Sequence, residues 1–274
     1  MHTIIIGKRS NLSQHLLVTI EGAVSVSASE ATQYLEQFDW QNHQPVNLIL
    51  NQFQPVTKLG DLSNPIDYIN NAIVSSANIL HSIESQASNI NKIIYTSSSS
   101  VYGNNSACKE TDAPAPISLH ASLKLANEKL VSNFCDQHAI NYTLARVFNM
   151  YAGTDEFSIV SKIIRAVKQH QTISLINQGG AMRDFIHIDD VTHAYQQILS
   201  TNAADKIINI ASGRGMTVSL ILDYLQQQNI QVTTHNITQD EINISIANND
   251  RLSKLIGQHQ FQLVEDYLLN ELQA

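Results

Sequence analysis

The sequence predicts an α/β protein whose core is a doubly wound parallel sheet, followed by a small C-terminal lobe. Short apolar segments recur along the first 150 residues, and segments of helical periodicity separate them. The first apolar segment, 3–6, ends at Gly7 and leads through a tight turn into a helix that carries Leu12, Leu16 and Leu17. A strand, a tight turn and a helix N-terminus together can bind a diphosphate through backbone N–H groups and the helix dipole.

The remaining elements follow from the same patterns. Strands are predicted at 23–27, 46–50, 93–96, 142–147, 173–176 and 206–211, and helices at 29–38, 65–85, 118–135, 157–169 and 217–228. Leu119, Leu123, Leu130 and Val131 are expected on the apolar side of the 118–135 helix. Asp189 or Asp190 is expected to cap a further helix.

The composition limits the function classes. The chain has 274 residues, 43% hydrophobic and 15% charged, and no apolar run long enough to predict a membrane span. A net charge of −8 argues against nucleic acid as a partner. Cys108 and Cys135 lack metal-ligand spacing, and none of the eleven histidines forms an HxxxH pair. We therefore expect free thiols in a reducing cytoplasm and no metal site.

The stretch from Ile93 to Leu130 carries the residues suited to chemistry. Its strand ends in the hydroxyl run TSSSS, and a loop with Gly103 leads to a helix starting near Ser118. His120 and Lys124 are four residues apart on that helix, so they share a face and each can set the charge of the other.

This stretch resembles the extended short-chain dehydrogenase/reductases of the nucleotide-sugar epimerase/dehydratase branch. Their pattern is SSxxVYG, then a loop of the ETDxPxP type, then YxxxK on a helix. The resemblance implies a Rossmann-type fold with catalytic residues Ser98, His120 and Lys124. His120 stands where that family has tyrosine, and the run of hydroxyls leaves the register of Ser98 open by one residue.

The resemblance also implies NAD(P) as the cofactor. The family's GxxGxxG glycines correspond to Gly7, Ser10 and Ser13, so two of the three are serine. The cofactor-binding residues implied are Gly7, Lys8, Arg9, Ser10, Asn11, Leu12, Asn51 and Lys124. The 23–27 strand lacks an acidic residue at its end, and the cations of the turn suit a 2′-phosphate, so NADP is favoured over NAD. One strand–helix unit of the family is missing before residue 46.

Later segments resemble the family's substrate-binding parts. Residues 144–153 are similar to RxxNxYG, and residues 179–191 are similar to GxxxxRDFIHVDDV. The resemblance assigns Tyr102, Asn149 and Arg183 to substrate binding, with Arg183 near a diphosphate. It predicts a cofactor lobe over 1–150, to which about 184–212 returns, and a mainly substrate-binding lobe over 151–274.

Three hypotheses follow for His120. Lys124 disfavours imidazolium, so a neutral His120 could accept a proton from a sugar hydroxyl. Alternatively, water or Tyr102 carries the proton, or the site is catalytically silent. Ser99 and Ser100 stand where 4,6-dehydratases of this branch have Asp-Glu, which disfavours dehydration.

The prediction is therefore an NAD(P)-dependent nucleotide-sugar epimerase or 4-keto-sugar reductase of surface polysaccharide sugar synthesis. The alternative is a silent member that binds a nucleotide sugar, a dinucleotide or a partner protein. The resemblance also suggests a homodimer formed by the helices at 65–85 and 118–135. The enzyme hypothesis depends on a first turn that still offers bare N–H groups to a diphosphate.

Overall fold

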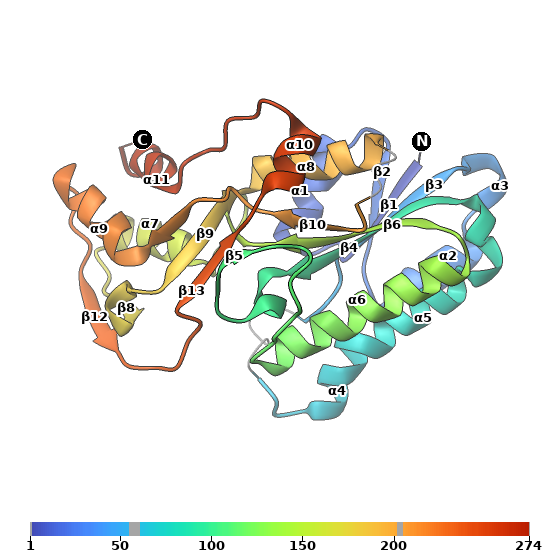
Figure 1. The fold of residues 1–274 in the computed structure, drawn as a ribbon, viewed down its shortest axis with the longest axis horizontal. Helices are drawn as coiled ribbons and strands as arrows, with labels where there is room; N and C mark the ends of the chain where they lie inside the picture. Colours follow the sequence, from blue (N-terminus) through green and yellow to red (C-terminus); the bar gives the residue numbers. More distant parts are fainter. Residues whose placement is uncertain (1, 55–60, 202–204, 274) are drawn as a thin grey trace. The chain divides into compact units, whose positions relative to one another are not determined.

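The structure, a computed structural model, describes residues 2–54, 61–201 and 205–273 (Figure 1). The chain forms two compact units. Unit 1 consists of residues 1–101, 116–146 and 195–208, and unit 2 of residues 102–115, 147–194 and 209–274. The sequence-based lobes concern which residues bind cofactor and substrate, and that assignment stays a prediction.

Unit 1 is built on a doubly wound sheet, which confirms the predicted fold class. Among the described residues the strand order is β10-β6-β4-β3-β1-β2. The strands are β1 (His2–Ile6), β2 (Ala23–Val26), β3 (Val46–Leu50), β4 (Ile90–Ser98), β6 (Asn141–Val147) and β10 (Ile207–Ile210). β1 pairs in parallel with both β2 and β3, and β3 pairs in parallel with β4. All five residues of β3 are buried, as expected for a strand covered on both faces.

The predicted helices of unit 1 are present, with bounds that differ from the predictions by a few residues. They are α1 (Asn11–Thr19), α2 (Ala31–Gln37), α3 (Trp40–His43), α4 (Pro65–Ile69), a π-helix (Asn70–Val74), α5 (Ser75–Ser82) and α6 (Leu119–Gln137), with a 3-10 turn at Glu84–Asn89. The single helix predicted at 65–85 is a continuous helical stretch from Pro65 to Ser82, in which the π-helix lies between α4 and α5. α6 begins as predicted, because the Ser118 hydroxyl accepts a hydrogen bond from the Ala121 N–H at 3.2 Å. α5 and α6 run side by side (Figure 1).

The sheet ends at β2. In the usual order 3-2-1-4-5-6 a further strand lies outside the second one. Here, in the described part of the chain, the short helices α2 and α3 occupy the sequence between β2 and β3. The predicted loss of one strand–helix unit is confirmed.

Unit 2 contains two small sheets. The first has the order β11-β9-β13-β5, with β7 also paired to β9, and the second pairs β12 with β8. The strands are β5 (Asn105–Cys108), β7 (Asn149–Tyr151), β8 (Ile173–Ile176), β9 (Met182–His187), β11 (Gly215–Thr217), β12 (Thr234–Ile237) and β13 (Ile244–Ala247). The helices are α7 (Ile159–Gln169), α8 (Ile188–Ser200, which continues into unit 1), α9 (Val218–Gln227), α10 (Asp250–Ile256) and α11 (Val264–Gln273), and a 3-10 turn lies at Asn177–Gly179. A further 3-10 turn at Ser99–Tyr102 begins in unit 1 and ends in unit 2.

The predicted cap of α8 is wrong. Asp189 and Asp190 lie inside the first turn of the helix. The imidazole of His187 takes the capping role, because its Nδ1 accepts a hydrogen bond from the Asp189 N–H at 3.1 Å. Asp190 instead accepts a hydrogen bond from the Gln262 N–H at 3.0 Å.

None of the helices that the described residues form is long and apolar enough to cross a membrane. Within the same residues, no three His, Cys, Asp or Glu side chains are grouped so that they could hold a metal ion.

Candidate active site

The turn after β1 is tied to the end of β2. The N–H groups of Gly7 and Lys8 both donate to the Val26 carbonyl, at 2.9 and 3.1 Å, and the Ser10 N–H donates to the Gly7 carbonyl at 3.0 Å. Gly7 has a φ of +114°, which side chains of L-residues rarely allow. The Lys8 and Arg9 side chains are exposed, and Asn11 and Leu12 open α1.

Side chains fill the turn where the family pattern has glycine. The Ser10 hydroxyl caps α1 by accepting a hydrogen bond from the Ser13 N–H at 3.0 Å. The Asn51 amide, at the end of β3, donates to the Ser10 hydroxyl at 2.6 Å and to the Ser13 hydroxyl at 2.8 Å. The turn as folded therefore does not fit a diphosphate, because two hydroxyls and an amide occupy the place of bare backbone.

The hydroxyl run at the end of β4 separates into two buried residues, Thr96 and Ser97, and three half-buried residues, Ser98, Ser99 and Ser100. Thr96 shares a 2.7 Å hydrogen bond with the hydroxyl of Tyr195, and the Ser97 hydroxyl donates to Glu128 at 2.5 Å. Both side chains are buried. The Ser98 hydroxyl instead accepts from the Ser100 N–H at 3.2 Å. Because Ser98, Ser99 and Ser100 are all half-buried, the assignment of the catalytic serine to Ser98 stays a prediction.

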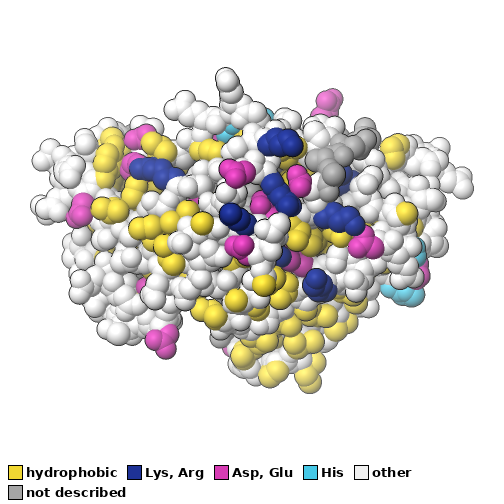
Figure 2. Space-filling model, in the orientation of Figure 1, with side chains coloured by type: hydrophobic (Ala, Val, Ile, Leu, Met, Phe, Trp, Pro, Cys, Tyr) yellow, Lys and Arg dark blue, Asp and Glu magenta, His cyan; other side chains and the backbone are white. Residues whose placement is uncertain are grey.

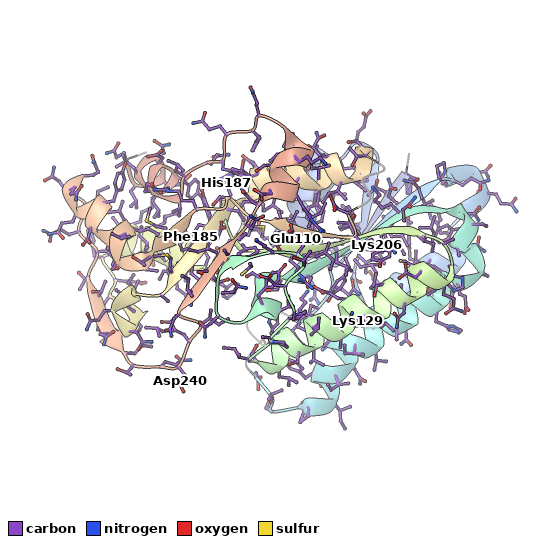
Figure 3. All side chains as sticks on the ribbon, in the orientation of Figure 1. Glu110, Lys129, Phe185, His187, Lys206 and Asp240 are labelled. Atoms are coloured by element: carbon purple, nitrogen blue, oxygen red, sulfur yellow. The ribbon has the colours of Figure 1, made fainter. Side chains whose placement is uncertain are left out.

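The buried face of α6 carries polar as well as apolar side chains, so the prediction of an apolar side holds for Val131 but only in part for the three leucines. Leu119 is 43% exposed, and Leu123 and Leu130 are half-buried. The fully buried residues are Ala121, Lys124, Asn127, Glu128, Val131 and Cys135. This is possible because the polar groups find partners, as when the Asn127 amide donates to the Ala72 carbonyl at 2.6 Å. Lys129 is on the exposed side of the helix (Figure 3).

Lys124 is held against the end of β4. Its Nζ donates to the Thr96 carbonyl at 2.8 Å and lies 4.5 Å from the ring centroid of Phe53 and 5.1 Å from that of Tyr95. Burial lowers the pKa of Lys124 to about 7, and the charge of Glu128 opposes this effect. The amine therefore titrates near neutral pH.

A buried ion pair lies one turn beyond Lys124. Glu128 accepts from the Nε and the Nη2 of Arg146 at 2.9 and 2.7 Å, in a bidentate geometry. His120, Lys124 and Glu128 follow one another at intervals of four residues, so a single face of α6 carries all three.

His120 is half-buried beside an aromatic ring. Its imidazole meets the Phe53 ring edge-to-face, with the centroids 5.1 Å apart. Burial, and then the charge of Lys124, lower the pKa of His120 to about 4. The imidazole is therefore neutral at pH 7, as the sequence predicts.

The three predicted substrate residues lie in unit 2 and have protein partners there. The Tyr102 hydroxyl donates to Asn209 at 2.7 Å, and the Asn149 amide donates to the Asp184 carbonyl at 3.0 Å. Arg183 forms an ion pair with Glu241 at 2.8 Å. Their role in substrate binding stays a prediction.

Sequence reasoning missed three side chains. Phe53 follows a buried strand, and nothing in the sequence there indicates that its ring contacts His120 and Lys124. Glu241 is distant in sequence from its partner Arg183. Glu30 accepts a hydrogen bond from the Ser27 hydroxyl at 2.6 Å, just beyond β2. In dinucleotide-binding folds the acidic residue that binds the ribose lies about 20 residues after the first turn, and this spacing could have identified Glu30.

The sheet, the first turn and the position of α6 define a Rossmann-type α/β protein. The model of the NAD dependent epimerase/dehydratase family matches residues 24–211, and the chain belongs to that family.

Individual relatives agree with this assignment. Protein CapI of Staphylococcus aureus is 32% identical over 148 residues, which are 52% of this chain and 43% of CapI. A putative UDP-glucose 4-epimerase of Methanocaldococcus jannaschii is 23% identical over 194 residues, which are 68% of this chain and 62% of that protein. The chain thus spans about half the length of the curated relatives it matches.

Solved structures share the fold along the whole chain. UDP-glucuronic acid 4-epimerase from Bacillus cereus, in complex with UDP-glucuronic acid and NAD, superposes with a TM-score of 0.84 at 20% identity, covering 100% of this chain and 98% of that one. UDP-glucose 4-epimerase of Thermus thermophilus, in complex with NAD, gives a TM-score of 0.84 at 15% identity, covering 99% and 98%.

Proposed function

We propose that this protein is an NAD(P)-dependent nucleotide-sugar epimerase or 4-keto-sugar reductase that acts in the cytoplasm in surface polysaccharide sugar synthesis. The observation that carries the proposal is the hydrogen bond from Lys124 to the Thr96 carbonyl. It fixes the His120 face of α6 at the end of the strand that carries Ser98. The relatives' UDP-sugar ligands and epimerase names support the substrate class.

His120 is the proposed proton acceptor. At neutral pH its uncharged imidazole can take the proton of a sugar hydroxyl, while the Ser98 hydroxyl donates a hydrogen bond to the same oxygen. Because its pKa is about 4, the imidazole is a weak base, and it holds almost no proton to return to a ketone at pH 7. At pH 7 the resting site is therefore in the protonation state needed to accept a hydroxyl proton, and not in the state needed to donate one to a ketone.

The charges near the first turn act in opposite directions on cofactor choice. Lys8 and Arg9 favour a 2′-phosphate and hence NADP, the preference predicted from the sequence. The Glu30 carboxylate on Ser27 suits a ribose 2′-hydroxyl and favours NAD. Competition between NADH and NADPH in a binding titration measures which charge prevails.

Turnover of a panel of UDP-sugars tests the function. Wild type is expected to convert at least one of UDP-glucose, UDP-glucuronic acid and UDP-N-acetylglucosamine, and His120→Ala is expected to lower kcat by about 10²- to 10⁴-fold. Lys129→Ala, on the exposed face of the same helix, is the matched control and keeps wild-type turnover. Turnover that appears only in His120→Tyr would show that the natural site is silent.

The silent family member remains the second candidate. It is favoured by the occupied first turn and by the low pKa of His120. Such a protein would bind a nucleotide sugar, a dinucleotide or a partner protein without converting it.

We also propose that the protein is a homodimer. Exposed apolar side chains gather on α4, the π-helix and the start of α6, at the lower edge of the view in Figure 2. They are Leu62, Ile66, Ile69, Val74, Ile117 and Leu119. A second copy of the same surface would remove them from water.

A further inference from the structure

One short segment occupies the crevice in which a doubly wound sheet binds its ligand. Ligands of such sheets lie beyond the carboxyl ends of the strands. Residues Asn51–Gln54, here called the plug, directly follow the carboxyl end of β3. The Asn51 N–H still pairs with the Ile6 carbonyl at 2.9 Å, so the plug starts as a continuation of the sheet.

Two glutamines anchor the plug on neighbouring helices. Gln52 donates to the Ser76 hydroxyl of α5 at 3.1 Å, and Gln54 donates to the Tyr68 carbonyl of α4 at 2.5 Å. The other two side chains of the plug reach the candidate site: Asn51 contacts the first turn, and Phe53 contacts α6.

Asn51 occupies the first turn as an internal ligand. Its amide donates to both the Ser10 and the Ser13 hydroxyls, at 2.6 and 2.8 Å. Ser10 in turn accepts from the Ser13 N–H, which is one of the free donors that a helix N-terminus would otherwise offer to an anion. A diphosphate and the Asn51 side chain thus compete for the same place.

Phe53 covers the titratable pair of α6. Its ring lies 4.5 Å from the Lys124 ammonium and meets the His120 imidazole edge-to-face at 5.1 Å. A group that approached Lys124 or His120 from this side would have to displace the ring.

We propose that the plug is an autoinhibitory element, and that a dinucleotide binds only when Asn51 and Phe53 have left the first turn and the α6 pair. The inference rests on the proposed function, since it assumes that a dinucleotide is the ligand. If the plug inhibits binding, the apparent dissociation constant of the dinucleotide equals the intrinsic constant divided by the fraction of molecules whose plug is withdrawn. Inhibition by the plug also reverses the role that the sequence assigns to Asn51, which is cofactor binding.

The two roles of Asn51 predict opposite effects of Asn51→Ala: coenzyme binding tightens if the plug inhibits it and weakens if Asn51 binds the coenzyme. Calorimetric titration with NAD⁺, NADH, NADP⁺ and NADPH is carried out on wild type, Asn51→Ala and Phe53→Ala. Asn51→Ala lacks the two hydrogen bonds that hold Asn51 in the first turn, and we expect it to bind coenzyme about ten-fold more tightly than wild type. We expect Phe53→Ala to bind coenzyme more tightly than wild type as well. Asn91→Ala is the matched control, because it removes an amide bond between strands, to Asn47 at 2.8 Å, at the opposite end of the sheet.

A second measurement does not depend on coenzyme. NMR titration of His120 is expected to show that Phe53→Ala raises its pKa from about 4 towards the ordinary value of 6.5, because the ring contributes to its burial. Circular dichroism confirms that each variant is folded.

The outcomes separate the two proposals. If wild type binds a coenzyme and Asn51→Ala binds it equally or more weakly, Asn51 is a ligand contact, and the plug is refuted while the proposed function stands. If the folded wild type and all variants bind none of the four coenzymes, both proposals fail. Tighter binding by Asn51→Ala and Phe53→Ala, with Asn91→Ala unchanged, supports both.

Discussion

The lowered pKa of Lys124 predicts that the protein becomes more stable as the pH rises above neutral. Lys124 ordinarily keeps its proton up to about pH 10.5, but in the folded protein its pKa is about 7. Between these values the unfolded chain binds a proton that the folded protein does not, so the free energy of unfolding increases with pH. Linkage gives a gain of about 2 kcal/mol between pH 7 and pH 9.

Urea unfolding at pH 7 and pH 9 measures this gain. Trp40, the single tryptophan, is buried in unit 1 with Lys124, so its fluorescence reports the unfolding of that unit. Lys124→Met removes the titrating amine and leaves the others, among them the Cys135 thiol whose pKa is raised by burial to about 12. The gain in wild type should exceed that in the variant by about 2 kcal/mol. Equal pH dependence in the two proteins would refute the reasoning, since the buried amine would then titrate as it does in water.

Two further predictions concern stability and assembly. Gly7→Ala is expected to destabilise the protein by about 1–3 kcal/mol, because the added Cβ would lie 2.8 Å from the Asn51 carbonyl oxygen at a φ of +114°. Thermal unfolding compares this variant with Gly22→Ala, a position that also has a positive φ but no neighbour within 4 Å. An equal loss of stability in both variants would show that the clash contributes nothing. Ile66→Asp is expected to convert the dimer into a monomer, because Ile66 is 73% exposed on α4 and a charge there opposes burial. Light scattering measures the mass, and an unchanged dimer would exclude this surface.

Much of unit 1 could be predicted because its strands are short, apolar and buried on both sides. The bounds predicted for β3 agree with the structure, and the missing strand–helix unit could be recognised by comparison with the spacing of the family. The predicted helix at 65–85 is present as a continuous stretch to Ser82, but its π-helical segment at Asn70–Val74 has no composition signal and could not be predicted.

The candidate site could be predicted only where local spacing decides the chemistry. The shared face of His120 and Lys124, and the neutral state of the imidazole, follow from an interval of four residues. The polar part of the buried face of α6 could not be predicted, because burial of Glu128 depends on Arg146 of β6 and Ser97 of β4. The same limit applies to Asn51, whose partner Ser10 is 41 residues away in the chain.

The truncated sheet has a consequence for solubility. A border strand presents unpaired backbone groups to which another chain can add, and proteins limit this risk by keeping such strands short. β2 has only four residues, so it presents few such groups. Without a strand outside it, β2 therefore offers only a short template for the addition of another chain.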